Sequence, residues 1–172
     1  MIQLCKQAGA KCICVASTKE KLDICTKLGA DFVINYKENP DYQHLVKEFT
    51  NGRGADIIAD PVGASNAARN IDALAVDGRW VCFGMLGGKE VPNFNMGALL
   101  AKRGTLHTTL LKSRSVEYKA KLLAQMRAVV FESGFGFEPV LHKVFKMSEA
   151  RQAHEMMEAN ETIGKILLEY DL

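Results

Sequence analysis

Short, mainly apolar runs alternate with longer amphipathic segments through most of the chain. Each run ends at a small or polar residue, and short apolar runs bounded by turn residues predict buried strands. The predicted strands of this first part cover residues 12–16, 32–34, 55–59 and 79–83. Between the first two runs, Leu22, Cys25 and Leu28 fall three positions apart, which is the spacing of one helix face. Strands that alternate with helices in this way predict an α/β fold with a doubly wound parallel sheet.

The second part of the chain continues this alternation less regularly. The other predicted elements are helices at 1–8, 39–49, 65–74, 96–102, 116–132 and 148–160, and strands at 105–111, 140–145 and 165–169. We expect Asp77-Gly78 to form a turn and Ser148 to cap the last helix. The helix at 116–132 carries an apolar stripe that we expect to be buried. That stripe consists of Tyr118, Leu122, Leu123, Met126 and Val130.

Length, charge and cysteine content exclude several classes of function. A chain of 172 residues has the length of one domain. Its net charge of +2 argues against strong nucleic-acid binding, and no apolar run is long enough to span a membrane. The five cysteines form no CxxC pair and no zinc-spaced set with histidine, so we predict no metal site. We interpret Cys12 and Cys14 as small buried hydrophobic residues, and reduced thiols fit a cytoplasmic protein.

The residues that follow the strands carry the chemical signal, because open parallel sheets bind ligands beyond the carboxyl ends of their strands. Ser17 and Thr18 follow the first strand, and Lys21 lies one helical turn further on. An acidic residue here would bind the ribose hydroxyls of NADH, whereas hydroxyls, a lysine and a helix N-terminus suit the 2′-phosphate of NADPH. Glu20 weakens this interpretation unless it points to solvent. The alternative is that Ser17 and Thr18 are only helix caps and Lys21 is a solvated charge.

The later strand ends are compatible with the same ligand. Tyr36 could bring a hydroxyl to the phosphate, although a tyrosine is more often a packing residue. Val62-Gly63 and Phe83-Gly84 lie at the ends of the next two strands, where glycine allows a close approach of backbone to ligand and equally allows a sharp turn. The histidines are scattered, and we predict no catalytic residue.

Several motifs resemble those of the zinc-free medium-chain dehydrogenase/reductases. They are the runs Ala30-Asp-Phe-Val-Ile-Asn-Tyr36, Gly54-Ala-Asp-Ile-Ile-Ala-Asp-Pro-Val-Gly63 and Leu74-Ala-Val-Asp-Gly-Arg-Trp-Val-Cys-Phe-Gly84. The segments 102–106, 110–114, 157–160 and 164–166 narrow the resemblance to the quinone oxidoreductase branch, near the zeta-crystallins.

The resemblance implies a Rossmann-like fold and transfer of hydride from NADPH to a quinone or another electron-poor alkene, without a metal. It implies that Ser17, Lys21 and Tyr36 hold the 2′-phosphate, and that Val62-Gly63 and Phe83-Gly84 lie along the ribose and nicotinamide. The stretch Thr105–Leu111 would be the sheet edge that pairs in a homodimer.

This chain also departs from the family's pattern. The family would have a strand and a glycine-rich turn just before Met1, so we expect a gap between the strands at 12–16 and 55–59. Residues 1–135 then form a truncated dinucleotide-binding domain. Residues 136–172 form a segment that returns to a catalytic domain in the family. We expect weak or absent turnover from this chain alone. The alternative is a non-catalytic module that dimerises or binds nucleotide weakly.

Overall fold

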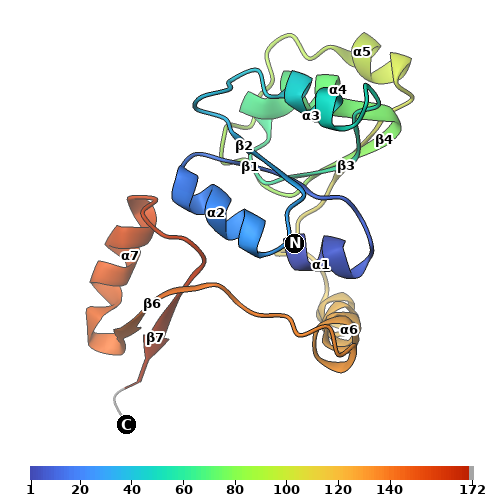
Figure 1. Ribbon diagram of the computed structural model, residues 1–172. Helices are drawn as coiled ribbons and strands as arrows, with labels where there is room; N and C mark the ends of the chain where they lie inside the picture. The colour runs from blue at the N-terminus through green and yellow to red at the C-terminus, as the bar shows by residue number, and fades with distance from the viewer. Residues whose placement is uncertain (171–172) are drawn as a thin grey trace. The chain divides into compact units, whose positions relative to one another are not determined.

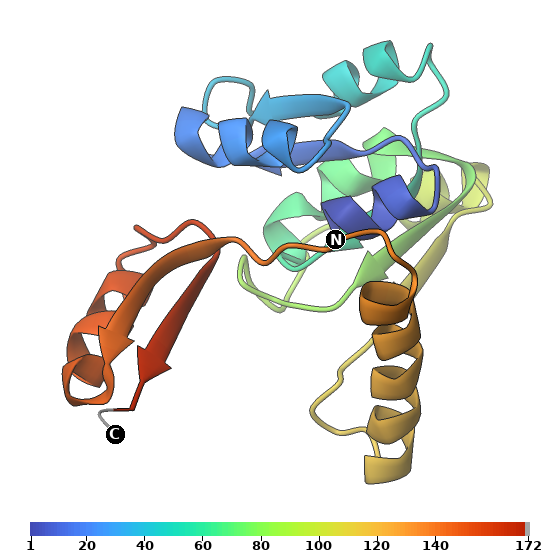
Figure 2. The same cartoon turned by 60° about the horizontal axis from the view of Figure 1, so that its bottom comes forward.

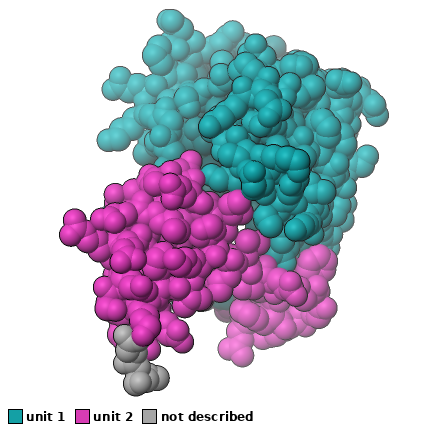
Figure 3. All heavy atoms as spheres, turned by 60° about the vertical axis from the view of Figure 1, so that its left-hand side comes forward, with its two compact units in different colours: residues 1–123 teal, residues 124–172 magenta. Residues whose placement is uncertain are grey.

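The computed structural model describes residues 1–170, which form an α/β fold (Figure 1). The chain divides into two compact units, Met1–Leu123 and Ala124–Leu172, which Figure 3 distinguishes by colour. The first elements are α1 (Ile2–Gln7), β1 (Ile13–Ala16), α2 (Lys19–Lys27), β2 (Phe32–Asn35), α3 (Gln43–Phe49), β3 (Ala55–Asp60), the 3₁₀ turn η1 (Ala64–Asn66), α4 (Ala67–Ala73), β4 (Leu74–Cys82), α5 (Met96–Ala101) and β5 (Thr105–Thr108). There follow α6 (Val116–Arg127), the short π-helix η2 (Ala128–Glu132), β6 (Leu141–Lys146), the 3₁₀ helix η3 (Met147–Glu149), α7 (Ala150–Glu158) and β7 (Lys165–Glu169).

The strands of the described residues pair only in parallel, as the alternation of strands and helices predicts. In the first unit β1 pairs with β2, and a separate sheet has the order β3-β4-β5. Helix α2 packs against the β1–β2 pair (Figure 2). The predicted gap between the first and third strands is confirmed, because no strand pairing joins β1 to β3. In the second unit β6 and β7 pair with each other, and α7 packs against β6.

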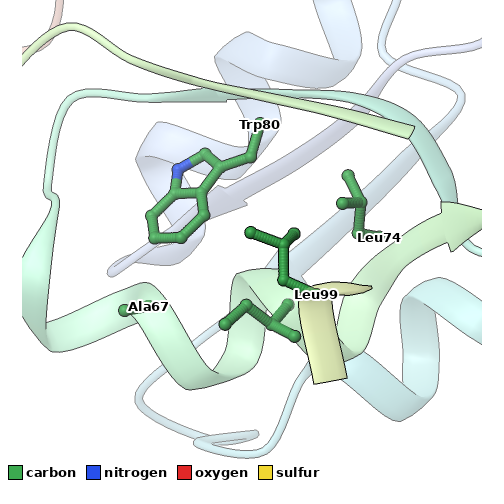
Figure 4. Packing of buried hydrophobic residues seen from close by; sticks show 5 residues of the cluster. Ala67, Leu74, Trp80 and Leu99 are labelled. Atoms are coloured by element: carbon green, nitrogen blue, oxygen red, sulfur yellow. The ribbon is translucent and has the colours of Figure 1, made fainter. Parts of the chain in front are cut away.

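Two hydrophobic clusters hold the first unit together. One contains Ala67, Ile71, Leu74, Trp80 and Leu99 (Figure 4). The other contains Ile34, Tyr42, Val46 and Ala73. Ile58 of β3 packs against both clusters, so the two sheets of this unit share a core even though they exchange no strand pairing. Burial of each large apolar side chain stabilises such a core by about 1.5–3 kcal/mol.

The predicted turn at Asp77-Gly78 lies within a strand. Strand β4 begins at Leu74, and its register against β3 shifts so that Ala55 pairs with Leu74 but Ile57 pairs with Arg79. The extra residues bulge out of the ladder, with Asp77 at φ 62°. The Asp77 carboxylate accepts hydrogen bonds from the Arg103 guanidinium at 2.7 and 2.6 Å, which holds the bulge in place.

Three further sequence predictions are wrong in detail. The strand predicted at 105–111 ends at Thr108. Ser148 does not cap a helix, because it lies inside η3, where the Glu149 carboxylate accepts a hydrogen bond from the Lys146 amide at 2.9 Å. The apolar stripe expected to be buried on the helix at 116–132 is largely exposed, and no residue of α6 is buried. Helical spacing gathers apolar residues on one face, but burial also needs a neighbouring element to cover that face.

Candidate functional site

The carboxyl ends of β1 and β2 bring together the first group of predicted site residues. Ala16 and Asn35 are register partners, so Ser17 and Tyr36 are the first residues beyond the paired ends. The Tyr36 amide continues the ladder by donating to the Ala16 carbonyl at 3.1 Å. Thr18 caps α2, and its Oγ1 accepts a hydrogen bond from the Lys21 amide at 3.3 Å. Ser17, Thr18 and Lys21 therefore lie at the start of one helix, and Tyr36 follows the neighbouring strand.

Glu20 adds a negative charge to this group, as the sequence indicates. Its backbone amide and the Thr18 hydroxyl both donate hydrogen bonds to the Glu20 carboxylate, and they lower the pKa of that carboxyl. Glu20 is exposed, so its carboxylate lies at the N-terminus of α2 and is also in contact with solvent. An incoming anion would compete with this carboxylate for the same donors.

The second group of predicted site residues follows the carboxyl ends of β3 and β4. Asp60 and Cys82 are register partners, so the turn at 61–63 and the loop at 83–88 leave the sheet side by side. Two backbone hydrogen bonds join turn and loop, from Leu86 to Pro61 at 3.3 Å and from Gly87 to Val62 at 2.7 Å. A third runs from Ala64 of η1 to Gly88 at 3.4 Å. A Cβ on Gly84 would collide with the Pro61 carbonyl oxygen, so this close contact requires glycine.

The backbone of Val62 and Gly63 is fully used inside the protein. Both amides donate to Oδ1 of Asp60, at 2.8 Å from Val62 and 3.1 Å from Gly63. The Val62 carbonyl accepts from Gly87, and the Gly63 carbonyl accepts from Asn66 at 3.0 Å. Gly63 is buried and Phe83 is exposed. This part of the predicted site therefore offers a ligand van der Waals surface and not hydrogen-bond donors.

The cysteines and the metal-ligating residue types show no preformed metal centre. In residues 1–170, no group of three or more His, Cys, Asp or Glu side chains is arranged to hold a metal ion. Cys12 is buried, its Sγ lies 3.8 Å from that of Cys14, and burial raises the pKa of both thiols. All five cysteines are free thiols. No helix within the described part of the chain is long and apolar enough to cross a membrane.

Comparison with protein families gives a match over most of the chain. Residues 1–127 match the family described as Zinc-binding dehydrogenase. Two relatives are a 2-haloacrylate reductase from Burkholderia sp. and a probable quinone oxidoreductase from Schizosaccharomyces pombe. Each is 30% identical to this chain, covers 98% of it and is itself covered over 50% of its own length. The chain thus spans about half the length of the curated relatives it matches.

Solved structures give the same fold. A crystal structure of an NAD-dependent alcohol dehydrogenase superposes with a TM-score of 0.81 at 28% identity, over 98% of this chain and 46% of that protein. A mycobacterial protein complexed with NADPH superposes with a TM-score of 0.75 at 27% identity, over 97% of this chain and 52% of that protein. The predicted fold class and the resemblance to quinone oxidoreductases are both confirmed. The two cofactors named for these structures differ, so the choice between them depends on the residues of this chain.

Proposed function

Because this chain belongs to the zinc-binding dehydrogenase family, we propose that it is the nucleotide-binding part of an NADPH-dependent oxidoreductase. The acceptor is a quinone or another electron-poor alkene. Relatives named as a quinone oxidoreductase and a 2-haloacrylate reductase support this acceptor class. The observation that supports the proposal is that Ser17 and Tyr36 directly follow the paired ends of β1 and β2, while Lys21 lies in the first turn of α2.

Each residue of the first group has a defined part in binding the cofactor. The hydroxyls of Ser17 and Tyr36 donate to the 2′-phosphate, and the Lys21 ammonium balances its charge. Thr18 holds the first turn of α2 and so sets the position of Lys21. Val62, Gly63, Phe83 and Gly84 provide the surface along the ribose and nicotinamide. Bound NADPH supplies the hydride. Among residues 1–170, no group of three or more His, Cys, Asp or Glu side chains is arranged to hold zinc.

The cofactor assignment is tested by titrating the chain with NADPH and NADH and comparing the dissociation constants. We expect tighter binding of NADPH and loss of that preference in Lys21→Glu, because the substitution places a second carboxylate beside the phosphate. Lys27→Glu is the matched control, since it makes the same charge change in the last turn of the same helix. Equal affinity for both nucleotides, or an equal effect of the two substitutions, contradicts the assignment.

The same proposal includes weak or absent turnover by the chain alone, a cytoplasmic location and a homodimer formed through the edge that begins at β5. All four residues of β5 are exposed, and β5 is the last strand of its sheet, so its outer backbone groups can pair with a second copy. Sedimentation of the chain with and without Leu106→Pro tests the dimer, because proline removes a ladder donor. A dimer without NADPH binding favours the second candidate function, a non-catalytic dimerisation module.

A further inference from the structure

The Asp60 carboxylate connects the turn at 61–63 to the hydrophobic core. The residue is 3% exposed and ends β3. Its Oδ1 accepts the amides of Val62 and Gly63. Its Oδ2 accepts from Nδ2 of Asn70 and from Nε1 of Trp80, both at 2.9 Å. Asn70 and Trp80 are themselves buried, so both oxygens of the carboxylate are used within the protein interior.

All four groups that contact this carboxylate donate a hydrogen bond to it. An ionised carboxylate only accepts hydrogen bonds, whereas an asparagine amide would direct an NH₂ group at one of the two pairs of donors. Leaving buried donors without an acceptor is costly, so the site selects a carboxylate. Two donors belong to the turn and two belong to α4 and β4, and one residue thereby fixes the turn relative to the core.

The loop at 83–88 depends on the same residue. The turn holds this loop through the bonds of Leu86 and Gly87, and the Phe83 amide donates to the Asp60 carbonyl at 3.0 Å. We propose that Asp60 is a positioning residue that binds no nucleotide itself. It holds the turn and the loop as one rigid surface against which the ribose and nicotinamide pack. This inference rests on the proposed function for its ligand, but not for the order of the turn.

The test compares substitutions that separate the turn from the core. Asp60→Ala removes the acceptor for both pairs of donors, and Asp60→Ser keeps a hydroxyl that can accept from the amides two and three residues on. Trp80→Phe removes one donor to Oδ2 and leaves the bonds of the turn intact. For each chain we would measure the NADPH dissociation constant, the amide hydrogen exchange of Val62 and Gly63 by NMR, and unfolding by circular dichroism.

We expect NADPH affinity to follow the protection of these two amides and not global stability. Asp60→Ala should speed their exchange and weaken NADPH binding about tenfold, a change of about 1.4 kcal/mol. Asp60→Ser should restore part of the amide protection and part of the NADPH affinity. Trp80→Phe should lower the stability of the chain while it leaves the amide protection and the NADPH affinity unchanged. If Asp60→Ala does not fold, Asp60→Asn replaces it, since its one carbonyl oxygen can serve only one pair.

Two results would overturn the inference. One is exchange at Val62 and Gly63 that stays as slow in the Asp60 variants as in the wild-type chain. The other is NADPH affinity that falls equally in Trp80→Phe, since that marks a purely structural role. If the wild-type chain binds no NADPH, the proposed function fails, and the exchange measurement alone still decides whether Asp60 positions the turn.

Discussion

A methyl group on Gly104 would enter space that the Leu74 side chain fills in the cluster that contains Trp80. A double-mutant cycle can measure this steric coupling between the two positions. Leu74 begins β4 and is 1% exposed. A Cβ on Gly104 would lie 2.9 Å from Cδ2 of Leu74 and 2.6 Å from Cδ1 of Leu99. Gly104 is not among the glycines with positive φ, so space and not backbone conformation opposes an alanine there.

The magnitudes follow from this packing. Leu74→Ala empties a buried site and should cost about 2–5 kcal/mol of unfolding free energy. Gly104→Ala overpacks the same site and should cost about 1–3 kcal/mol. In the double variant the new methyl group enters space that Leu74 has left, while the contact with Leu99 remains. The double variant should therefore cost less than the sum of the single variants, by at least about 0.5 kcal/mol.

Urea unfolding followed by the fluorescence of Trp80 is a suitable assay. Trp80 is the only tryptophan in the sequence, and it lies in the same cluster as Leu74 (Figure 4). Gly97→Ala is the control, because its added Cβ would meet only Asn95 Oδ1, at 3.5 Å, and alanine favours the helix. Additive single effects, or a Gly104→Ala variant as stable as Gly97→Ala, would refute this account of the packing.

Three further predictions concern charges and thiols. Glu20→Gln should tighten NADPH binding, because it removes the carboxylate that occupies the start of α2, whereas Glu48→Gln should not; fluorescence titration measures both. The pKa of the Asp31 carboxyl lies below its usual 3.8, because it accepts from the Cys12 amide and then from a lysine ammonium. The stability that this carboxylate provides is present above pH 3.8 and is lost as the pH falls through the lower pKa of the folded state. As the pH falls below about 4, the free energy of unfolding should therefore decrease more in the wild-type chain than in Asp31→Asn. Partial burial raises the pKa of the Cys14 thiol, so iodoacetamide at pH 8 should alkylate it more slowly in the folded chain than in urea. Mass spectrometry gives both rates, and equal rates would contradict this protection of a half-buried thiol.

The sequence alone determined the order of the elements and the residues that follow each strand. These depend on local patterns, namely hydrophobic spacing, a capping threonine and glycine at turns. Of Ser17 and Thr18, which the sequence offers as caps of the same helix, Thr18 caps α2. Ser17 and Tyr36 follow neighbouring strands because parallel strands end at the same edge of a sheet. The family resemblance also follows from contiguous motifs, which need no tertiary information.

Only the tertiary structure decided which side chains meet across the fold. Asp60 is an ordinary residue after a strand in the sequence, yet its partners include Asn70 and Trp80, ten and twenty positions away. Asp77 likewise enters a bulge held by Arg103, where local patterns predict a turn. The apolar stripe of α6 shows the same limit, since spacing predicts a face but not its cover. Register and burial arise from contacts between distant segments, and local periodicity carries no information about them.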